Sequence, residues 1–331
     1  MEKMTKALVT GANGFIGSHL VEALLKNGYA VTCLVRKTSD LKWLRGLTVK
    51  FAYGDCADRD SLYPAVKGMD YVYHAGALIH APDWQTYYDT NTLGTENLVR
   101  ACCEASPRLR RFVFVSSISA TGSAAGRGIL LNEQSECRPV SDYGKSKLLA
   151  ERMLNAYKKE IPITIIRPPN VLGTRQKELY SILKLLKYRL KPALGTKDKQ
   201  VSFCFVHDLV RAMILAGEKD EAAGETYFVT DGNVYSWGEV LDLGAKILGV
   251  EPFVIRIPHG FICACCRLLE FEAQISKRKP FFTRQQVKEL RERYWTYDGS
   301  KIEKQLGFKP QVKLEDGLRE TIGWYKQQGL L

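Results

Sequence analysis

A serine, a tyrosine and a lysine in the first half of the chain could together move a proton. Ser117 ends an apolar run, and Tyr143 precedes Lys147 by one helical turn. A free tyrosine has a pKa of about 10, so it is a poor base at neutral pH until a nearby ammonium stabilises its phenolate. Lys147 can supply that positive charge. Tyr143 can then exchange a proton with the oxygen of a substrate alcohol or carbonyl group, and Ser117 can hydrogen-bond the same oxygen. The set predicts an oxidoreductase acting on an alcohol or a carbonyl group.

Position along the chain selects this tyrosine and lysine from others with the same spacing. The run Ser141–Lys147 follows a predicted strand, Arg111–Val115, and the serine pair that ends it. Ordered signals on alternating strands and helices are far less frequent by chance than a single short motif. The other pairs are interpreted as solvated helix faces: Tyr63/Lys67, Tyr180/Lys184 and Tyr297/Lys301.

The run Thr10–Gly17 places three glycines between an apolar strand and a helical pattern. Gly11 can make the tight turn, Gly14 lets a pyrophosphate approach the backbone, and Gly17 lets the helix pack on the strand. The N-terminus of the helix then faces the phosphates. The run therefore predicts a dinucleotide-binding loop, with further cofactor contacts from the residues between the glycines, Asn13, Phe15 and Ile16.

The residues after the second strand indicate which dinucleotide is bound. A carboxylate here would hydrogen-bond the ribose 2′-hydroxyl of NAD, but the chain reads Val35-Arg36-Lys37. A guanidinium suits a 2′-phosphate instead, so NADP(H) is preferred, with Lys42 as a second contact, and NAD(H) stays possible. The alternative is that Arg36 is only a solvated surface charge.

Composition and charge are those of a globular enzyme. The 331 residues are 45% hydrophobic and 25% charged, with no internal repeat and no apolar run long enough to span a bilayer. The net charge of +12 is spread along the chain without a nucleic-acid-binding motif, so we expect no nucleic-acid partner. Nine scattered cysteines are typical of a reducing, cytoplasmic location. Cys263 and Cys266 are expected to pack, and no metal site is predicted.

Short β-rich runs alternate with helical patterns, which is typical of a parallel sheet covered on both faces. This predicts an α/β fold, a doubly wound parallel sheet of the Rossmann type, with a smaller, discontinuous C-terminal substrate-binding lobe. The dinucleotide-binding domain is predicted over 1–170 and 201–230, and the lobe over 171–200 and 231–331. Strands are predicted near 6–10, 30–35, 48–53, 70–75, 111–116 and 162–167, with returns to the sheet near 203–206 and 225–230. Helices are predicted from 16 to 28 and at 84–104, 141–160, 176–190, 236–248, 259–275, 283–292 and 314–328.

These motifs resemble those of an extended short-chain dehydrogenase/reductase of the NAD-dependent epimerase/dehydratase family, over nearly the whole chain. Further matching runs are Gly54-Asp55, His74–Ala77, Asn91–Asn97, Arg167–Gly173, Val206-His207-Asp208, Leu306–Pro310 and Gly323-Trp324-Tyr325. The resemblance implies that Asn91 supports the active site and that Tyr143 and Lys147 also touch the cofactor. It implies that adenine is held by Asp55 and Cys56, that the cofactor is lined by Ala75, Gly76 and Ala77, and that the nicotinamide meets Pro169, Asn170 and Val171.

Departures from the family pattern narrow the reaction. Dehydratases of the family resemble Thr-Asp-Glu at the serine segment, where this chain reads Ser117-Ile118-Ser119. Sugar epimerases usually carry an arginine that grips the substrate diphosphate and a histidine, at the positions of Val201 and Phe205. We therefore expect a ketone reductase or alcohol dehydrogenase for an apolar small molecule, similar to dihydroflavonol-reductase and 3β-hydroxysteroid-dehydrogenase-like members. The alternative is a nucleotide-sugar 4-epimerase with tightly bound NAD, which Asn170 leaves open.

Two partners are predicted besides the small-molecule substrate, and each would use its own surface. Members of the family often dimerise through two long helices, which here correspond to 84–104 and 141–160, so the resemblance implies a homodimer. A basic stretch at 277–293 follows an apolar helical pattern at 261–275. This pattern predicts a weak membrane-surface contact near 261–293.

Overall fold

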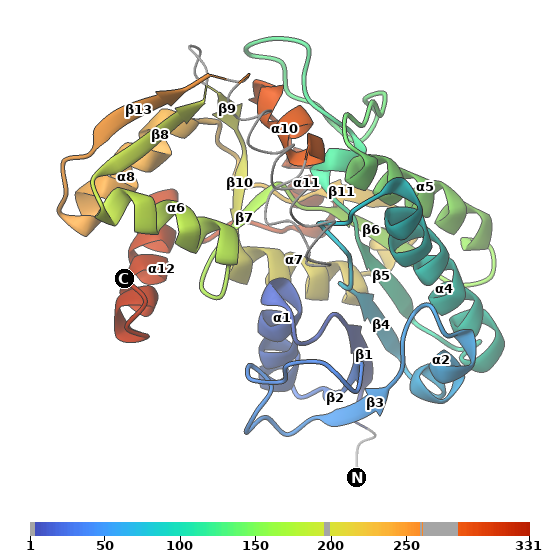
Figure 1. Cartoon of the computed structure of the whole chain (residues 1–331). Helices are drawn as coiled ribbons and strands as arrows, with labels where there is room; N and C mark the ends of the chain where they lie inside the picture. Colours follow the sequence, from blue (N-terminus) through green and yellow to red (C-terminus); the bar gives the residue numbers. More distant parts are fainter. Residues whose placement is uncertain (1–3, 195–198, 259, 261–283) are drawn as a thin grey trace.

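The computed structural model describes residues 4–194, 199–258, 260 and 284–331. Seven parallel strands form its central sheet, in the spatial order β11-β6-β5-β4-β1-β2-β3 (Figure 1). Their bounds are β1 Lys6–Thr10, β2 Ala30–Val35, β3 Lys50–Tyr53, β4 Tyr71–His74, β5 Arg111–Val115, β6 Ile163–Arg167 and β11 Thr226–Phe228. Because β1 pairs with β2 on one side and β4 on the other, the strand order reverses there, where such sheets bind ligands.

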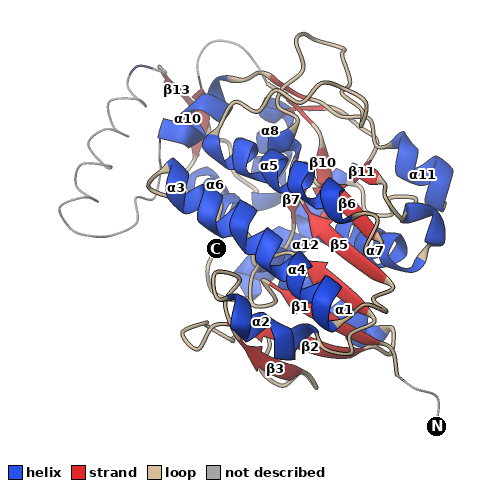
Figure 2. Ribbon diagram, turned by 90° about the vertical axis from the view of Figure 1, so that its right-hand side faces the viewer, coloured by secondary structure: helices blue, strands red, loops and turns tan. Residues whose placement is uncertain are grey.

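Helices cover both faces of the sheet because its inner strands are buried along almost their whole length (Figure 2). On one face, Leu20 of α1 and Met213 of α7 belong to the larger apolar core. On the other, Leu62 of α2, Leu98 of α4 and Leu154 of α5 belong to a second core. The bounds are α1 Phe15–Lys26, α2 Arg59–Val66, α4 Gly94–Ala105, α5 Asp142–Tyr157 and α7 Val206–Glu218.

The other elements gather around three small sheets. One contains β7 Asn170–Leu172 and β10 Phe203–Phe205, the next β12 Tyr235–Ser236, β9 Gln200–Val201 and β14 Tyr294–Trp295, and the last β13 Phe253–Ile257 and β8 Leu190–Leu194. The helices are α6 Lys177–Lys187, α8 Trp237–Leu248, α10 Arg284–Arg291, α11 Ser300–Leu306 and α12 Leu314–Gln327. Short helical turns are η2 Ile118–Ala120 and η3 Asp220–Ala222.

The predicted doubly wound parallel sheet is confirmed, and the six predicted strands of the first half lie within three residues of their expected bounds. One expectation was wrong, since the strand at 203–206 does not return to the central sheet. It pairs with β7, which lies beyond Pro168 and Pro169. Prolines have no N–H to extend a sheet ladder, so the chain leaves the central sheet there. The return near 225–230 is confirmed by β11, which pairs with β6.

The long helix predicted at 84–104 is divided into three parts. These are α3 Trp84–Tyr87, a π-helical segment η1 Tyr88–Leu93, and α4. A π-helical segment often marks a functional site, and this one carries Asn91. The helix predicted at 259–275 lies outside the described residues except for residue 260. Among the residues that the structure does describe, no helix is long and apolar enough to cross a membrane.

Candidate active site

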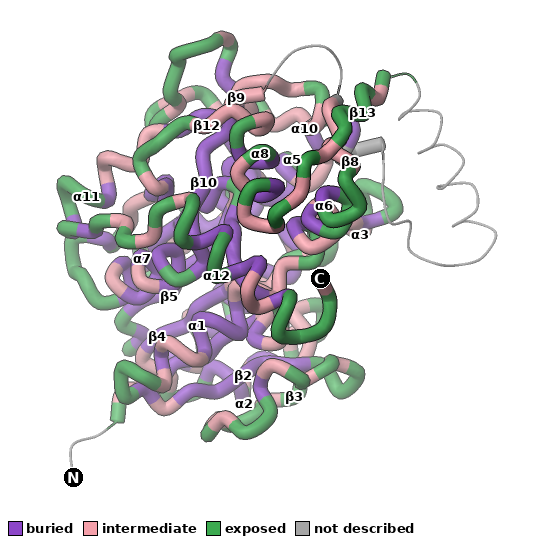
Figure 3. The backbone as a smooth tube through the Cα atoms, turned by 90° about the vertical axis from the view of Figure 1, so that its left-hand side faces the viewer, coloured by how far each residue is buried: buried purple, intermediate pink, exposed green. Residues whose placement is uncertain are grey.

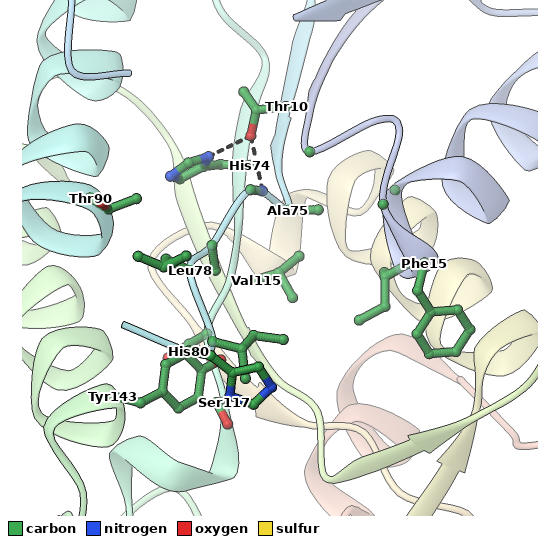
Figure 4. Close-up of a pocket in the computed structure, with 18 of the residues that line it drawn as sticks. Thr10, Phe15, His74, Ala75, Leu78, His80, Thr90, Val115, Ser117 and Tyr143 are labelled. Carbon is green, nitrogen blue, oxygen red and sulfur yellow. Dashed lines mark hydrogen bonds between the residues drawn. The ribbon is translucent and has the colours of Figure 1, made fainter. Parts of the chain in front are cut away.

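A cavity of about 730 Å³ lies at the carboxyl ends of the central strands. Thr10, His74 and Val115, the last residues of β1, β4 and β5, line it from the sheet side. Glu178 of α6 and Glu289 of α10 line it from the opposite side. Figure 4 shows that the glycine loop and Phe15 lie at one end of the cavity and that Ser117, Tyr143 and His80 lie together at the other. We call these the cofactor end and the substrate end.

The glycine loop packs too closely for any other residue at two positions. Gly11 has φ +65°, and a Cβ atom there would lie 2.7 Å from the backbone of Gly76. A Cβ on Gly17 would lie 2.1 Å from the carbonyl oxygen of Gly11. Gly14, the N-cap of α1, makes no side-chain capping bond, and the first turn of α1 has no acidic residue. The helix terminus is therefore free of any anion of its own and fits the pyrophosphate of a dinucleotide.

A buried hydrogen-bond chain fixes the loop after β4 against the end of β1. The hydroxyl of Thr10 accepts a bond from the Gly76 N–H at 3.1 Å and lies 2.6 Å from His74 Nδ1 (Figure 4). His74 Nε2 lies 3.0 Å from the hydroxyl of Thr95. Burial lowers the pKa of His74 to about 3, so its ring stays neutral and can both donate and accept. This series of hydrogen bonds positions the Ala75–Ala77 backbone along the cavity.

Ser117 and Tyr143 meet at the substrate end of the cavity. Ser117 caps η2 by accepting a bond from the Ser119 N–H at 3.1 Å. Tyr143 lies in the first turn of α5, and Ser141 caps this helix by accepting a bond from the Gly144 N–H. Burial and the nearby Glu289 carboxylate raise the pKa of Tyr143 well above its usual value, whereas a hydrogen bond from Ser117 lowers it. Without an added positive charge, Tyr143 is therefore a proton donor at neutral pH.

Lys147 lies one helical turn after Tyr143 and is fully buried. Its ammonium donates a 2.7 Å hydrogen bond to the Val115 carbonyl and lies 4.0 Å from the centre of the Phe114 ring. Loss of solvation lowers the pKa of Lys147 to about 7, although Glu151 opposes the shift. Glu151 is itself paired with Arg167 at 2.6 Å. A desolvated ammonium gains most from a neighbouring anion, and Lys147 lies on the same helix as Tyr143, one turn further along.

Asn91 is buried and hydrogen-bonds two segments at the substrate end of the cavity. Its side chain accepts a 2.8 Å bond from the Leu78 N–H and donates to the Leu78 carbonyl and to the Ser146 hydroxyl, both at 3.0 Å. Leu78 lines the cavity, and Ser146 lies in α5 between Tyr143 and Lys147. Asn91 thus holds the loop after β4 against the helix that carries the proposed proton donor.

Arg36 lies at the cofactor end. Its side chain is 70% exposed, and its guanidinium is 4.0 Å from the carboxylate of Asp55, which also lines the cavity. The backbone N–H of Arg36 donates to the Ser39 hydroxyl at 3.1 Å. Lys42 does not line the cavity, and its ammonium instead lies 4.6 Å from the centre of the Trp43 ring. The cavity lining therefore contains Arg36 but not Lys42.

Most of the residues predicted from the sequence converge on this one cavity. Those that line it are Gly11, Asn13, Gly14, Phe15, Ile16, Gly17, Arg36, Asp55, Cys56, Ala75, Gly76, Ala77, Ser117, Tyr143, Pro169, Asn170 and Val171. Asn91 and Lys147 lie directly behind the wall, through the bonds just described. In the described part of the chain, no cluster of His, Cys, Asp and Glu could hold a metal ion. Cys263 and Cys266 fall outside that part.

Three polar residues at the substrate end were not found from the sequence. Glu289 of α10 accepts a 2.5 Å bond from the Ser141 hydroxyl, and burial raises its pKa. His80 Nε2 lies 3.6 Å from the carboxylate of Glu178, whose pKa this contact lowers. His80 follows the matched run His74–Ala77 closely, so the course of that loop could have suggested it. Nothing in the sequence places Glu178 beside His80 or Glu289 near Tyr143.

Comparisons with known proteins agree with this geometry. The model of the NAD dependent epimerase/dehydratase family matches residues 7–230. The chain is 27% identical to the sterol-4-alpha-carboxylate 3-dehydrogenase (decarboxylating) of Mus musculus, over 97% of this chain and 91% of that protein. It is also 27% identical to the UDP-glucose 4-epimerase of Vibrio cholerae, over 98% and 97%. A solved structure of MoeE5 in complex with UDP-glucuronic acid and NAD superposes with a TM-score of 0.77 at 26% identity, covering 98% of this chain and 99% of that one.

Proposed function

The chain belongs to the NAD dependent epimerase/dehydratase family, and we propose that this member interconverts a ketone and a secondary alcohol on a relatively apolar small molecule, with preference for NADP(H). It is an NAD(P)-dependent enzyme of the extended short-chain dehydrogenase/reductase type. The observation that carries the proposal is the charge of the cavity lining. Among its described residues the only arginine or lysine is Arg36, at the cofactor end.

The substrate end is poorly suited to a nucleotide diphosphate. Its wall combines apolar Leu78, Ile79 and Leu290 with two carboxyl groups, those of Glu178 and Glu289. A diphosphate there would meet carboxyl groups rather than a guanidinium clamp, and like charges at short range are unfavourable. Val201 and Phe205, at the positions where sugar epimerases carry arginine and histidine, are buried and absent from the lining. These features support an uncharged, largely apolar substrate.

The residues of the site support a separate role for each group in the proposed reaction. A bound nicotinamide supplies the hydride chemistry. Tyr143 donates its hydroxyl proton to the carbonyl oxygen during reduction and recovers a proton from the alcohol during oxidation. Ser117 hydrogen-bonds the same oxygen and fixes its direction. Lys147 stabilises the phenolate left on Tyr143, since its buried ammonium lacks solvent that would weaken the attraction.

Preference for NADP(H) is supported by the single guanidinium at the cofactor end. Arg36 follows β2 and lines the cavity, where its exposed side chain is free to turn toward a 2′-phosphate. Asp55 lies 4.0 Å away and partly neutralises it, but a phosphate carries more charge than this exposed carboxylate. The free cysteines among the described residues are consistent with the cytoplasmic location that we also propose.

The second candidate is a nucleotide-sugar 4-epimerase with tightly bound NAD. Asn170 lines the cavity as in many sugar-active members, and the epimerase of Vibrio cholerae is as similar to this chain as the sterol dehydrogenase is. An epimerase gains by holding its cofactor, because the same nicotinamide removes and returns one hydride. A reductase must exchange its cofactor at every turnover. Cofactor exchange therefore discriminates the two functions.

The test starts from the purified full-length protein. We expect it to bind added NADPH reversibly and to oxidise it when an apolar ketone, such as a steroid or long-chain ketone, is supplied. UDP-glucose should neither inhibit this reaction nor protect the protein from unfolding. Release of stoichiometric NAD on denaturation, together with protection by micromolar UDP-glucose, would replace this proposal with the epimerase.

We also retain the homodimer as a proposal. The helical segments it would use, 84–104 and 141–160, carry exposed charges at Arg100, Glu104, Lys145 and Arg152. Such a surface favours a polar interface, which sedimentation at varied protein concentration would detect.

A further inference from the structure

A second surface of the molecule, remote from the sheet, exposes large apolar side chains. It is formed by the last turn of α6 with the residues after it and by β13, and we call it the α6–β13 surface. Figure 3 shows that β13 is exposed along most of its length, and only its last residue, Ile257, is partly buried. The exposed fractions are Phe253 73%, Tyr188 64%, Val254 55%, Ile255 43% and Leu185 40%.

The two segments of this surface are joined through the backbone. The N–H of Phe253 donates to the Arg189 carbonyl at 2.8 Å, and β13 pairs with β8 from Phe253 opposite Leu190 onward. Arg189, two residues after α6, and Phe253 are therefore neighbours in space although they are far apart in the sequence. Isolated exposed apolar residues are ordinary, whereas exposed apolar patches mark interaction sites, and here Phe253 and Ile255 share one face of β13, which starts beside the residues that follow α6.

Exposed cations lie on the same segments as these apolar side chains. They are Lys184, Lys187, Arg189 and Arg256. In the described segments 184–194 and 251–258 the only acidic residue is the exposed Glu251, and Asp242 of α8 is paired with Lys191 at 2.5 Å. The surface therefore combines apolar bulk with an excess of positive charge.

This combination distinguishes between possible occupants. A second copy of the chain docking through a twofold axis would bring the same cations together, which is unfavourable. Nucleic acid would use the cations but not Val254, Ile255 or Leu185. An anionic bilayer uses both, because apolar side chains enter the boundary between headgroups and acyl chains while cations meet the phosphates. We infer that the α6–β13 surface docks on an anionic lipid bilayer.

The position of the α6–β13 surface would bring the cavity close to a docked bilayer. Helix α6 begins beside the cavity, where Glu178 lines the wall, and ends at the surface with Lys184 and Lys187. Eleven residues at about 1.5 Å per residue make this helix roughly 16 Å long. A docked molecule would hold its cavity within about that distance of the lipid. This fits the apolar substrate of the proposed function, but the binding itself does not depend on the reaction.

The test is sedimentation of the full-length protein with vesicles of phosphatidylcholine alone or mixed with phosphatidylglycerol. We expect binding to the mixed vesicles that weakens as salt is raised. Phe253→Ser with Ile255→Ser should weaken it about tenfold or more, through loss of apolar burial. Lys184→Gln with Lys187→Gln should weaken it roughly fivefold for each cation removed.

Matched control variants come from other parts of the surface. Tyr53→Ser removes an aromatic side chain that is 55% exposed on β3, and Lys304→Gln with Lys326→Gln removes two exposed cations. These should bind vesicles like the wild type. NADPH titration and thermal unfolding of every variant verify that it is folded.

The inference is overturned if the wild type does not bind, or binds both kinds of vesicle equally. It is also overturned if the α6–β13 variants bind like the controls, which would move the contact elsewhere, for example to the stretch 261–293. Loss of concentration-dependent self-association in the variants, without vesicle binding, would identify a protein partner instead. Failure to reduce any ketone would affect only the proposed function.

Discussion

The cofactor end of the cavity is made mainly of backbone, whereas the substrate end is made of side chains from distant elements. At the cofactor end, Gly11 and Gly17 pack against neighbouring backbone with no room for a Cβ. At the substrate end, Glu178 and Glu289 reach the wall from α6 and α10. The first end can vary little without losing the fold, while the second can change its side chains at small cost. The difference explains how relatives of similar sequence act on substrates as different as a sterol acid and a UDP-sugar.

The comparison predicts that a substitution at the substrate end can remove most turnover while cofactor binding is retained. Tyr143→Phe removes the transferable proton but keeps the ring and its packing, so turnover should fall by about 10²- to 10⁴-fold. NADPH should bind nearly as before, which fluorescence titration would measure. Tyr63→Phe is the matched control, since Tyr63 also precedes a lysine by four residues. Near-wild-type turnover of Tyr143→Phe would exclude the acid–base role.

At the cofactor end, by contrast, we expect a substitution to weaken both the fold and cofactor binding. In Gly17→Ala the new Cβ would lie 2.1 Å from the Gly11 carbonyl, so the loop and α1 must shift apart. We expect a loss of about 1–3 kcal/mol in the free energy of unfolding, measured with urea, and a loss of NADPH binding. Gly323→Ala in α12 is the control, because nothing lies within 4 Å of its Cβ position. If Gly17→Ala keeps normal stability and binding, the tight packing does not constrain this end.

Arg36→Ala tests whether a side chain decides cofactor choice within an end that is otherwise backbone. It should weaken NADPH binding by roughly 1.5–3 kcal/mol, which is more than tenfold, and leave NADH binding almost unchanged. Lys37→Ala removes the adjacent exposed cation, which does not line the cavity, and should change neither affinity. Equal titration curves for NADPH and NADH in the wild type would contradict the preference.

The smallest effect is expected for Glu289→Gln. The Glu289 carboxylate raises the pKa of Tyr143, so its neutralisation should lower that pKa and favour the phenolate. In alcohol oxidation, the acidic limb of the kcat profile should therefore move to lower pH, by up to about one unit. Glu292→Gln, on a nearby residue that does not line the cavity, should leave the profile in place. A shift to higher pH would mean that Glu289 acts on Tyr143 in some other way.

The same contrast explains which parts of the site the sequence could predict. Predicted site residues that are close together in the chain, such as those of the glycine loop, also lie together in the cavity lining, because strand, turn and helix signals fix their relative positions. The strand at 203–206 was misplaced because its partner depends on where the chain turns after Pro168-Pro169, which local patterns do not encode. Lys42, predicted as a second contact for a 2′-phosphate, has its ammonium against the Trp43 ring and outside the cavity lining, because its spacing within a loop sets no direction for the side chain.

The sequence by itself predicted the glycine loop between strand and helix, the parallel sheet, and the helix that carries Tyr143 and Lys147. Each of these depends on short-range geometry, namely a turn that needs glycine, buried β-rich runs, and a tyrosine and a lysine one helical turn apart. Only the tertiary structure decided that Lys147 is fully buried, with its pKa lowered to about 7, and that Glu289 lies close enough to raise the pKa of Tyr143. Solvation and electrostatic interaction depend on distances through space, and residues 143 and 289 are brought together by packing that no local pattern records.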